Sequence, residues 1–237
     1  MRTARSFSRT AEISAKAEMY NDEVPEAPEE PEEPEEPVGA KEYSIINWTA
    51  NGWGRSVASY NAIIEILKEQ NADIVTMLHV CNKFPNATPA EIAAAAGYEY
   101  YHFAPGYDYG GGTVYGHMIM SHIPFEVQED IAALPTDTNS SEGRGMGHVL
   151  INLNGVETDL YYGYGDNREA ATAFFEAAIK AIAEETGRPF ILSAGDLCGM
   201  SGATAEFAGK EVETYYAAGT AQFMVNPDYM SIVSGTA

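Results

Sequence analysis

The sequence predicts a layered α/β domain over residues 41–237, preceded by two segments of different composition at 1–20 and 21–40. Two observations support the domain. Short apolar runs of strand length alternate with helical segments in which apolar residues recur every three or four positions. The chain of 237 residues is also 45% hydrophobic, which is enough for a sizeable core. We therefore expect residues 41–237 to fold as one domain.

Helices and strands alternate along this domain. The second helix shows the clearest boundaries, because Thr88 can cap its start, Pro89 suits its first turn and Gly97 suits its end. Antiparallel hairpins are expected where strands follow one another directly, as around the glycines at 110–112. The predicted helices are 57–71, 89–96 and 168–186, and the predicted strands are 43–48, 73–78, 98–103, 117–121, 149–153, 158–162 and 190–194.

The N-terminal segment 1–20 has the alternation of a strand with one buried face. Ile13, Ala15, Ala17 and Met19 are separated by polar residues, so they would lie on one side of an extended chain. An isolated strand is not stable, so this arm would need a sheet to join. A helical or disordered tail is the alternative interpretation.

The segment 21–40 is rich in proline and glutamate. Proline occupies every third position from 25 to 37, and polyproline II has three residues per turn, so this composition favours a stiff extended chain. At ~3.1 Å per residue, about 20 residues would reach on the order of 60 Å. We expect an acidic polyproline II spacer, and an ordinary solvated linker is the alternative.

The net charge of the protein indicates which kinds of partner it can bind. The chain has a formal net charge of −22, and residues 41–237 alone contain 24 Asp and Glu against 9 Lys and Arg. Because nucleic-acid affinity comes largely from Lys and Arg, we expect no nucleic-acid partner. The sequence contains no apolar run of 18 residues, so we expect neither a membrane span nor an intact signal peptide.

Several short segments within residues 41–234 form a recognisable series. They are Ile45-Ile46-Asn47, the helix-to-strand step 71–78, Gly97-Tyr98-Glu99-Tyr100, the strand 116–124, the helix start at Asn167-Arg168, Ile191-Leu192-Ser193-Ala194-Gly195-Asp196 and the strand 227–234. In this order, the segments resemble the endonuclease/exonuclease/phosphatase superfamily, also called deoxyribonuclease-I-like. The resemblance implies a four-layer α/β/β/α sandwich.

The resemblance carries over only part of the family's chemistry. In the family, an Asn and a Glu hold a divalent cation, and an Asp-x-Asn pair and two histidines surround the scissile phosphate. Asn47 and Asp196 match this pattern, whereas His79 stands at the position of the Glu. Cys198 replaces the Asn of the pair, and Gly163 replaces the first histidine. The resemblance also places the family's closing Asp-His pair beyond residue 237.

These replacements make a catalytic role the less favoured expectation. Mg²⁺ prefers anionic oxygen ligands, and an imidazole at position 79 removes one. We therefore expect no cofactor. The alternative is a hydrolase that uses Mg²⁺ or another divalent cation, with Asn47, Asp196 and His79 at its site. A zinc site formed by His79, Asp196 and Cys198 is a further alternative, and the remaining histidines are expected to be ordinary strand residues.

The two cysteines allow two interpretations. If the resemblance holds, Cys81 and Cys198 both lie at strand ends around the former active site. A disulfide between them would indicate an oxidising compartment, consistent with an extracellular or cell-surface protein. Two buried reduced thiols are the alternative.

The arm and the shortened domain together suggest self-assembly. A missing closing strand would leave an open sheet edge, which the arm of a neighbouring copy could fill by β-augmentation. Such a head-to-tail contact would form a ring or a filament, so we predict a homo-oligomer or polymer. The main functional expectation is thus a non-catalytic, self-assembling extracellular structural protein. The alternatives are the hydrolase and a secreted ligand- or glycan-binding module, for which the tyrosines at 98–115 and 161–164 could form a surface.

Overall fold

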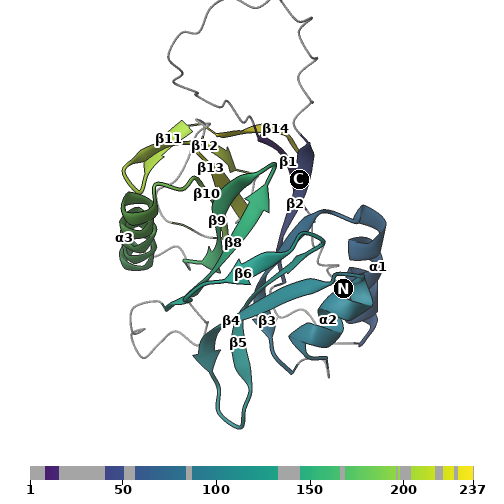
Figure 1. The fold of residues 1–237 in the computed structure, drawn as a ribbon. Coiled ribbons are helices and arrows are strands. Elements are labelled where there is room, and N and C mark those ends of the chain that lie inside the picture. Colours follow the sequence, from purple (N-terminus) through teal and green to yellow (C-terminus); the bar gives the residue numbers. More distant parts are fainter. Residues whose placement is uncertain are drawn as a thin grey trace, which may run out of the picture.

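A computed structural model of the chain shows two β-sheets packed face to face, with helices on both outer sides (Figure 1). The helices α1 (Val57–Gln70) and α2 (Pro89–Ala96) cover one sheet, and α3 (Glu169–Thr186) covers the other. This arrangement confirms the predicted α/β/β/α sandwich. The structure describes residues 9–15, 41–50, 57–83, 87–132, 145–165, 169–195, 197, 204–216, 221–226 and 229–236.

The first sheet has six strands in the order β14-β1-β2-β3-β5-β4. Strands β2 and β3 are parallel and are connected by α1, as expected for a strand–helix–strand unit. The other neighbours pair in antiparallel fashion. The strands are β1 (Arg9–Ala15), β2 (Glu42–Thr49), β3 (Ile74–Cys81), β4 (Tyr100–Asp108), β5 (Val114–Ser121) and β14 (Met230–Thr236).

The second sheet has the order β11-β12-β13-β10-β9-β8-β6, and the short strand β7 also pairs with β8. Its parallel pair is β9 and β10, which α3 connects. Both sheets thus contain one central parallel pair. The strands are β6 (Phe125–Val127), β7 (Ile131–Ala132), β8 (Gly145–Leu153), β9 (Val156–Tyr164), β10 (Phe190–Gly195), β11 (Thr204–Phe207), β12 (Lys210–Tyr216) and β13 (Ala221–Val225).

Three layers of apolar side chains hold the sandwich together. Because successive side chains of a strand point to opposite faces, neighbouring residues of the same strand enter different layers. Ile46 packs towards α1 and α2, whereas Ile45 packs between the two sheets. The layer under the first two helices includes Val75, Leu67 and Ile92, the layer between the sheets includes Ile119, Val149 and Ile191, and the layer under α3 includes Phe175, Ile179 and Leu192.

The predicted helices and buried strands are confirmed, but the structure adds strand residues outside the apolar runs. The hairpin of β4 and β5 continues beyond the predicted 98–103 and 117–121 into residues with exposed side chains. The strands β11 to β13 were not predicted as separate elements. In both places the backbone pairs as in a sheet while the side chains lack a long apolar pattern, so periodicity gives no signal.

The N-terminal arm joins the sheet of its own chain. Strand β1 lies between β2 and β14, and pairs with both in antiparallel fashion. Of the predicted assembly residues, Ile13 and Ala15 lie in this strand, opposite Tyr43 of β2 and Met230 of β14 respectively. Ala17 and Met19 lie outside the described residues, as does the predicted spacer 21–40. The expected strand is confirmed, and its insertion into a neighbouring copy stays a prediction.

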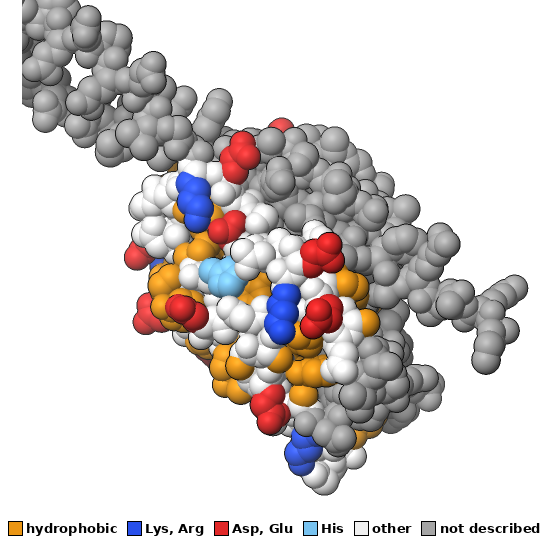
Figure 2. All heavy atoms as spheres, turned by 90° about the vertical axis from the view of Figure 1, so that its right-hand side faces the viewer, with side chains coloured by type: hydrophobic (Ala, Val, Ile, Leu, Met, Phe, Trp, Pro, Cys, Tyr) orange, Lys and Arg blue, Asp and Glu red, His pale blue; other side chains and the backbone are white. Residues whose placement is uncertain are grey.

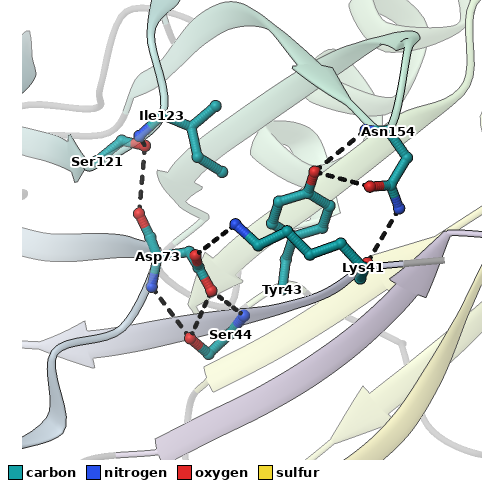
Figure 3. A network of polar contacts seen from close by, with 7 residues as sticks. All are labelled: Lys41, Tyr43, Ser44, Asp73, Ser121, Ile123 and Asn154. Carbon is teal, nitrogen blue, oxygen red and sulfur yellow. Dashed lines mark hydrogen bonds and ion pairs between the residues drawn. The ribbon is translucent and has the colours of Figure 1, made fainter. Parts of the chain in front are cut away.

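A polar network fixes the amino-terminal ends of β2 and β3 (Figure 3). The Asp73 carboxylate accepts hydrogen bonds from the Ser44 backbone N–H and hydroxyl, both at 2.9 Å, and pairs with Lys41 at 3.4 Å. Across the sandwich, the Tyr43 hydroxyl donates to Asn154 Oδ1 at 3.0 Å, and Asn154 Nδ2 donates to the Lys41 carbonyl. These contacts connect both sheets at this end of the sandwich.

The surface agrees with the acidic composition. On the face that carries α1 and α2, the described acidic side chains are spread apart, and the described Lys and Arg side chains are isolated rather than gathered (Figure 2). Among the helices that the structure describes, none has the length and apolar character needed to cross a membrane. The absence of a nucleic-acid partner stays a prediction.

Candidate functional site

The candidate site lies at the carboxyl ends of the parallel strands, where β2 and β3 meet β10 across the sandwich. Asn47 is near the end of β2 and is 1% exposed. Its Nδ2 donates a hydrogen bond to the Ala194 carbonyl of β10 at 2.9 Å. This bond fixes the orientation of the amide. Asn47 Oδ1 is buried and has no hydrogen-bond partner in the part of the chain that the structure describes.

At the level of Asn47, two hydroxyl groups join the sheets. Thr76 is the register partner of Asn47 in β3, and Ser193 precedes Ala194 in β10. Their hydroxyl oxygens lie 2.6 Å apart, and Thr76 also donates to the Ile46 carbonyl at 3.3 Å. Both side chains are fully buried. The pair thus connects β3 of the first sheet to β10 of the second sheet, next to Asn47 of β2.

His79 lies at an irregularity of β3. The register between β3 and β5 shifts between Leu78 and Val80, so His79 is the extra residue of a β-bulge. Its φ is +61°, a left-handed conformation that is uncommon for a residue with a Cβ. A bulge changes the direction of the side chain, and the His79 ring packs against Tyr164 of β9.

A second histidine, His117 of β5, lies beside His79. The His79 backbone N–H donates to His117 Nδ1 at 3.3 Å, so a neutral His117 carries its proton on Nε2. The ring centroids of the two residues are 6.0 Å apart, and both side chains are buried. From the sequence, His117 is predicted to be an ordinary strand residue. Only the antiparallel pairing of β3 with β5, which places it opposite Leu78, brings it to the site.

Two tyrosines pack against His79. The Tyr164 ring of β9 is 3.9 Å from the His79 ring, centroid to centroid, in an edge-on arrangement, and the Tyr115 ring of β5 is 5.9 Å away. The Tyr164 ring can take this position beside His79 because residue 195 is a glycine. A Cβ there would lie 2.8 Å from the Tyr164 ring and 2.9 Å from Leu78. These aromatic rings fill the space around His79, which is 2% exposed.

The remaining predicted site residues are at the same end of the sandwich or outside the described part. Cys81 is the last residue of β3 and is buried, and it forms no disulfide with any residue that the structure describes. Asp196 and Cys198 directly follow β10 but lie outside the described residues, so the disulfide stays a prediction. Within the described ranges, no three His, Cys, Asp or Glu side chains lie together in a way that could hold a metal ion.

Two further histidines take part in polar clusters away from the strand ends. His148 Nε2 lies 2.8 Å from Asp159, and Arg188 donates two hydrogen bonds to the same carboxylate. Burial alone would raise the pKa of Asp159, but the hydrogen bonds from His148 and Arg188 outweigh it and hold the pKa below its usual value. This cluster lies between β8 and β9 and stabilises the second sheet.

The other cluster links β4 to β9. His102 Nδ1 lies 2.6 Å from the Tyr162 hydroxyl, and His102 Nε2 lies 3.6 Å from Asp130. Burial lowers the pKa of His102, against the opposite influence of the Asp130 charge. Burial also raises the pKa of Asp130. Neither histidine cluster contains a residue that the family resemblance places at the active site.

The comparisons with known proteins identify the fold. No family model and no curated protein sequence matches the chain. Among solved structures, TDP2 from C. elegans superposes with a TM-score of 0.52 and 12% identity, covering 77% of this chain and 64% of that protein. An endonuclease/exonuclease/phosphatase from Beutenbergia cavernae has 18% identity and a TM-score of 0.49, covering 64% of this chain and 46% of that one. The chain thus spans less than two thirds of either protein. The two-sheet α/β/β/α sandwich and the match to TDP2 show that the chain has the endonuclease/exonuclease/phosphatase-type fold.

Proposed function

We propose that this protein is a phosphoester hydrolase whose site surrounds Asn47. The fold supports this proposal, because it is the endonuclease/exonuclease/phosphatase-type sandwich, a fold named after enzymes that cleave phosphoesters. The main observation is the Asn47 amide. It is fixed by its hydrogen bond to Ala194, and its buried Oδ1 has no partner among the described residues. A buried amide oxygen of this kind normally requires a partner.

A divalent cation would supply that partner. Asn47 Oδ1 fits the preference of such cations for oxygen, and Asp196, the next residue after β10, would be its anionic ligand. A bound cation would withdraw charge from a phosphate oxygen. Because His79 stands where the family has a carboxylate, Mn²⁺ or Zn²⁺ suits the site better than Mg²⁺.

The test is a hydrolysis assay on the full chain. The substrates are p-nitrophenyl phosphate and bis(p-nitrophenyl) phosphate, each assayed with Mg²⁺, Mn²⁺ or Zn²⁺. We expect cation-dependent release of nitrophenol by the unchanged protein. Asn47→Ala and Asp196→Asn should each lower kcat/KM by about 10²-fold or more, in line with the loss of one essential charge-stabilising group. The matched control is Asn61→Ala, which changes an exposed asparagine on α1 and should retain full activity.

Two outcomes would contradict the proposal. One is an unchanged protein that melts cooperatively but releases no nitrophenol above the buffer rate with any of the three cations. The other is an Asn47→Ala variant as active as Asn61→Ala. Thermal melting of each variant separates a lost catalytic group from a lost fold.

A second candidate function is a non-catalytic structural or ligand-binding protein of the cell surface. The specific observation in its favour is the packing of Tyr164 against His79, which fills the strand ends where a substrate would bind. Tyr164→Ala distinguishes the two candidates. If Tyr164 narrows an active hydrolase site, this variant should hydrolyse the substrates faster than the unchanged protein, whereas a site that has lost its chemistry stays inactive when opened.

A further inference from the structure

Strand β1 occupies a slot between two strands of the first sheet. On one side it pairs with β2, from Arg9 opposite Asn47 to Ser14 opposite Glu42. On the other side it pairs with β14, from Thr10 opposite Thr236 to Ala15 opposite Met230. Within the described chain, β1 is the strand that joins β14 to the rest of this sheet. The slot therefore requires a strand, and it recognises that strand through backbone hydrogen bonds on both edges.

The connection from β1 to β2 is much longer than this pairing requires. The strands are antiparallel neighbours, and Ser14 lies directly opposite Glu42. A turn of two to five residues normally joins strands placed in this way. Here the connection consists of residues 16–41, in which proline recurs at every third position from 25 to 37. That proline-containing stretch of 13 residues favours an extended chain on the order of 40 Å long, so the connection is long enough to reach a neighbouring copy.

The acceptor side of the slot is fixed to the domain independently of β1. The Ser44 backbone and hydroxyl donate to Asp73, and the Lys41 carbonyl accepts from Asn154 (Figure 3). These contacts hold the first residues of β2 against β3 and against the turn between β8 and β9. The β2 side of the slot thus remains positioned whichever copy of the chain supplies the strand.

From these observations we propose that β1 of one copy inserts between β2 and β14 of a second copy. The exchanged strand makes the same backbone hydrogen bonds that it makes within one chain, so exchange loses no pairing. Two copies can exchange arms reciprocally to give a dimer, or successive copies can pass the arm onward to give a chain of subunits. The surface that receives the arm of the other copy consists of the backbone edge of β2 on one side and that of β14 on the other.

Cysteine cross-linking across the β1–β2 register tests the exchange. In a Cys81→Ala, Cys198→Ala background, one copy carries Ser14→Cys and the other carries Glu42→Cys. Opposed residues of antiparallel strands lie at a Cα separation that permits a disulfide. The two proteins are unfolded, mixed in equal amounts, refolded together and oxidised. We expect a disulfide-linked dimer on non-reducing electrophoresis, because only exchange brings residue 14 of one copy to residue 42 of the other.

Two controls make the result specific. The first replaces Glu42→Cys by Glu65→Cys, which lies on the exposed side of α1 away from the slot and should give no dimer. The second replaces residues 16–40 by a short Asn-Gly turn, which forces β1 onto its own β2 and should abolish the dimer while the protein still folds. The proposal is overturned if the mixture gives no dimer, or if Glu65→Cys gives as much dimer as Glu42→Cys.

Discussion

The hydroxyl oxygens of Thr76 and Ser193 lie 2.6 Å apart and join the two sheets at the level of Asn47, the register partner of Thr76. Thr76 belongs to β3 and Ser193 to β10, so this bond connects the two parallel strand pairs of the sandwich. A hydroxyl pair in an otherwise apolar interior is stabilising only while both members have partners. The Thr76–Ser193 pair therefore fixes the separation of β3 and β10 at the candidate site.

Thr76→Val should destabilise the protein by about 1–3 kcal/mol, because it keeps the shape of the side chain but leaves the buried Ser193 hydroxyl without this partner. Ser193→Ala should cost less, since Thr76 can still donate to the Ile46 carbonyl. Urea unfolding measures both free energies, with the exposed change Ala62→Ser on α1 as control. Equal costs for the two substitutions would show that the Thr76–Ile46 bond contributes nothing.

Asp159→Asn should destabilise the protein at pH 7 by roughly 2–4 kcal/mol, because it removes the anion that pairs with the partly exposed Arg188 and the buried His148. The folded pKa of Asp159 is held below its usual value, so its stabilisation is complete above about pH 4 and is lost as the pH falls through the folded pKa. Melting temperatures measured from pH 7 to pH 2 should therefore converge for the variant and the unchanged protein. Glu65→Gln, on the exposed side of α1, is the control and should not show this convergence.

The ring-proton NMR signal of His102 should titrate below the ordinary value near 6.5, since burial lowers its pKa. Asp130→Asn should lower the midpoint further, because the Asp130 charge at 3.6 Å favours the protonated ring. The neighbouring exposed change Glu129→Gln removes the same charge one residue away and should shift the midpoint less. A midpoint that rises in Asp130→Asn would contradict the geometry of this pair.

The left-handed backbone of His79 predicts an order of stability among its variants. Asn tolerates a φ of +61°, whereas a β-branched residue does not, so His79→Asn should be more stable than His79→Val by about 1–2 kcal/mol. At Glu126, an exposed residue of β6, the same two substitutions should give the opposite order because Val is the better strand residue. Urea unfolding of the four variants decides whether the β-bulge at His79 persists in solution.

Part of the candidate site follows from the sequence. Asn47 and His79 each come at or near the end of a strongly apolar segment, and the carboxyl ends of neighbouring parallel strands meet at one edge of a sheet. His117 and Tyr164 could not be predicted in the same way. Their positions depend on which strands pair with β3 and β9 and in which register, and single-strand patterns carry no information about partners.

The sequence by itself determined the layered α/β class, the three helices and the buried strands, because these follow from the spacing of apolar residues along short segments. The tertiary structure alone decided that β1 lies between β2 and β14, that the β-bulge turns His79 towards Tyr164, and that Thr76 meets Ser193. These relationships join residues far apart in the chain. They depend on the register and packing of whole sheets, which local periodicity does not encode.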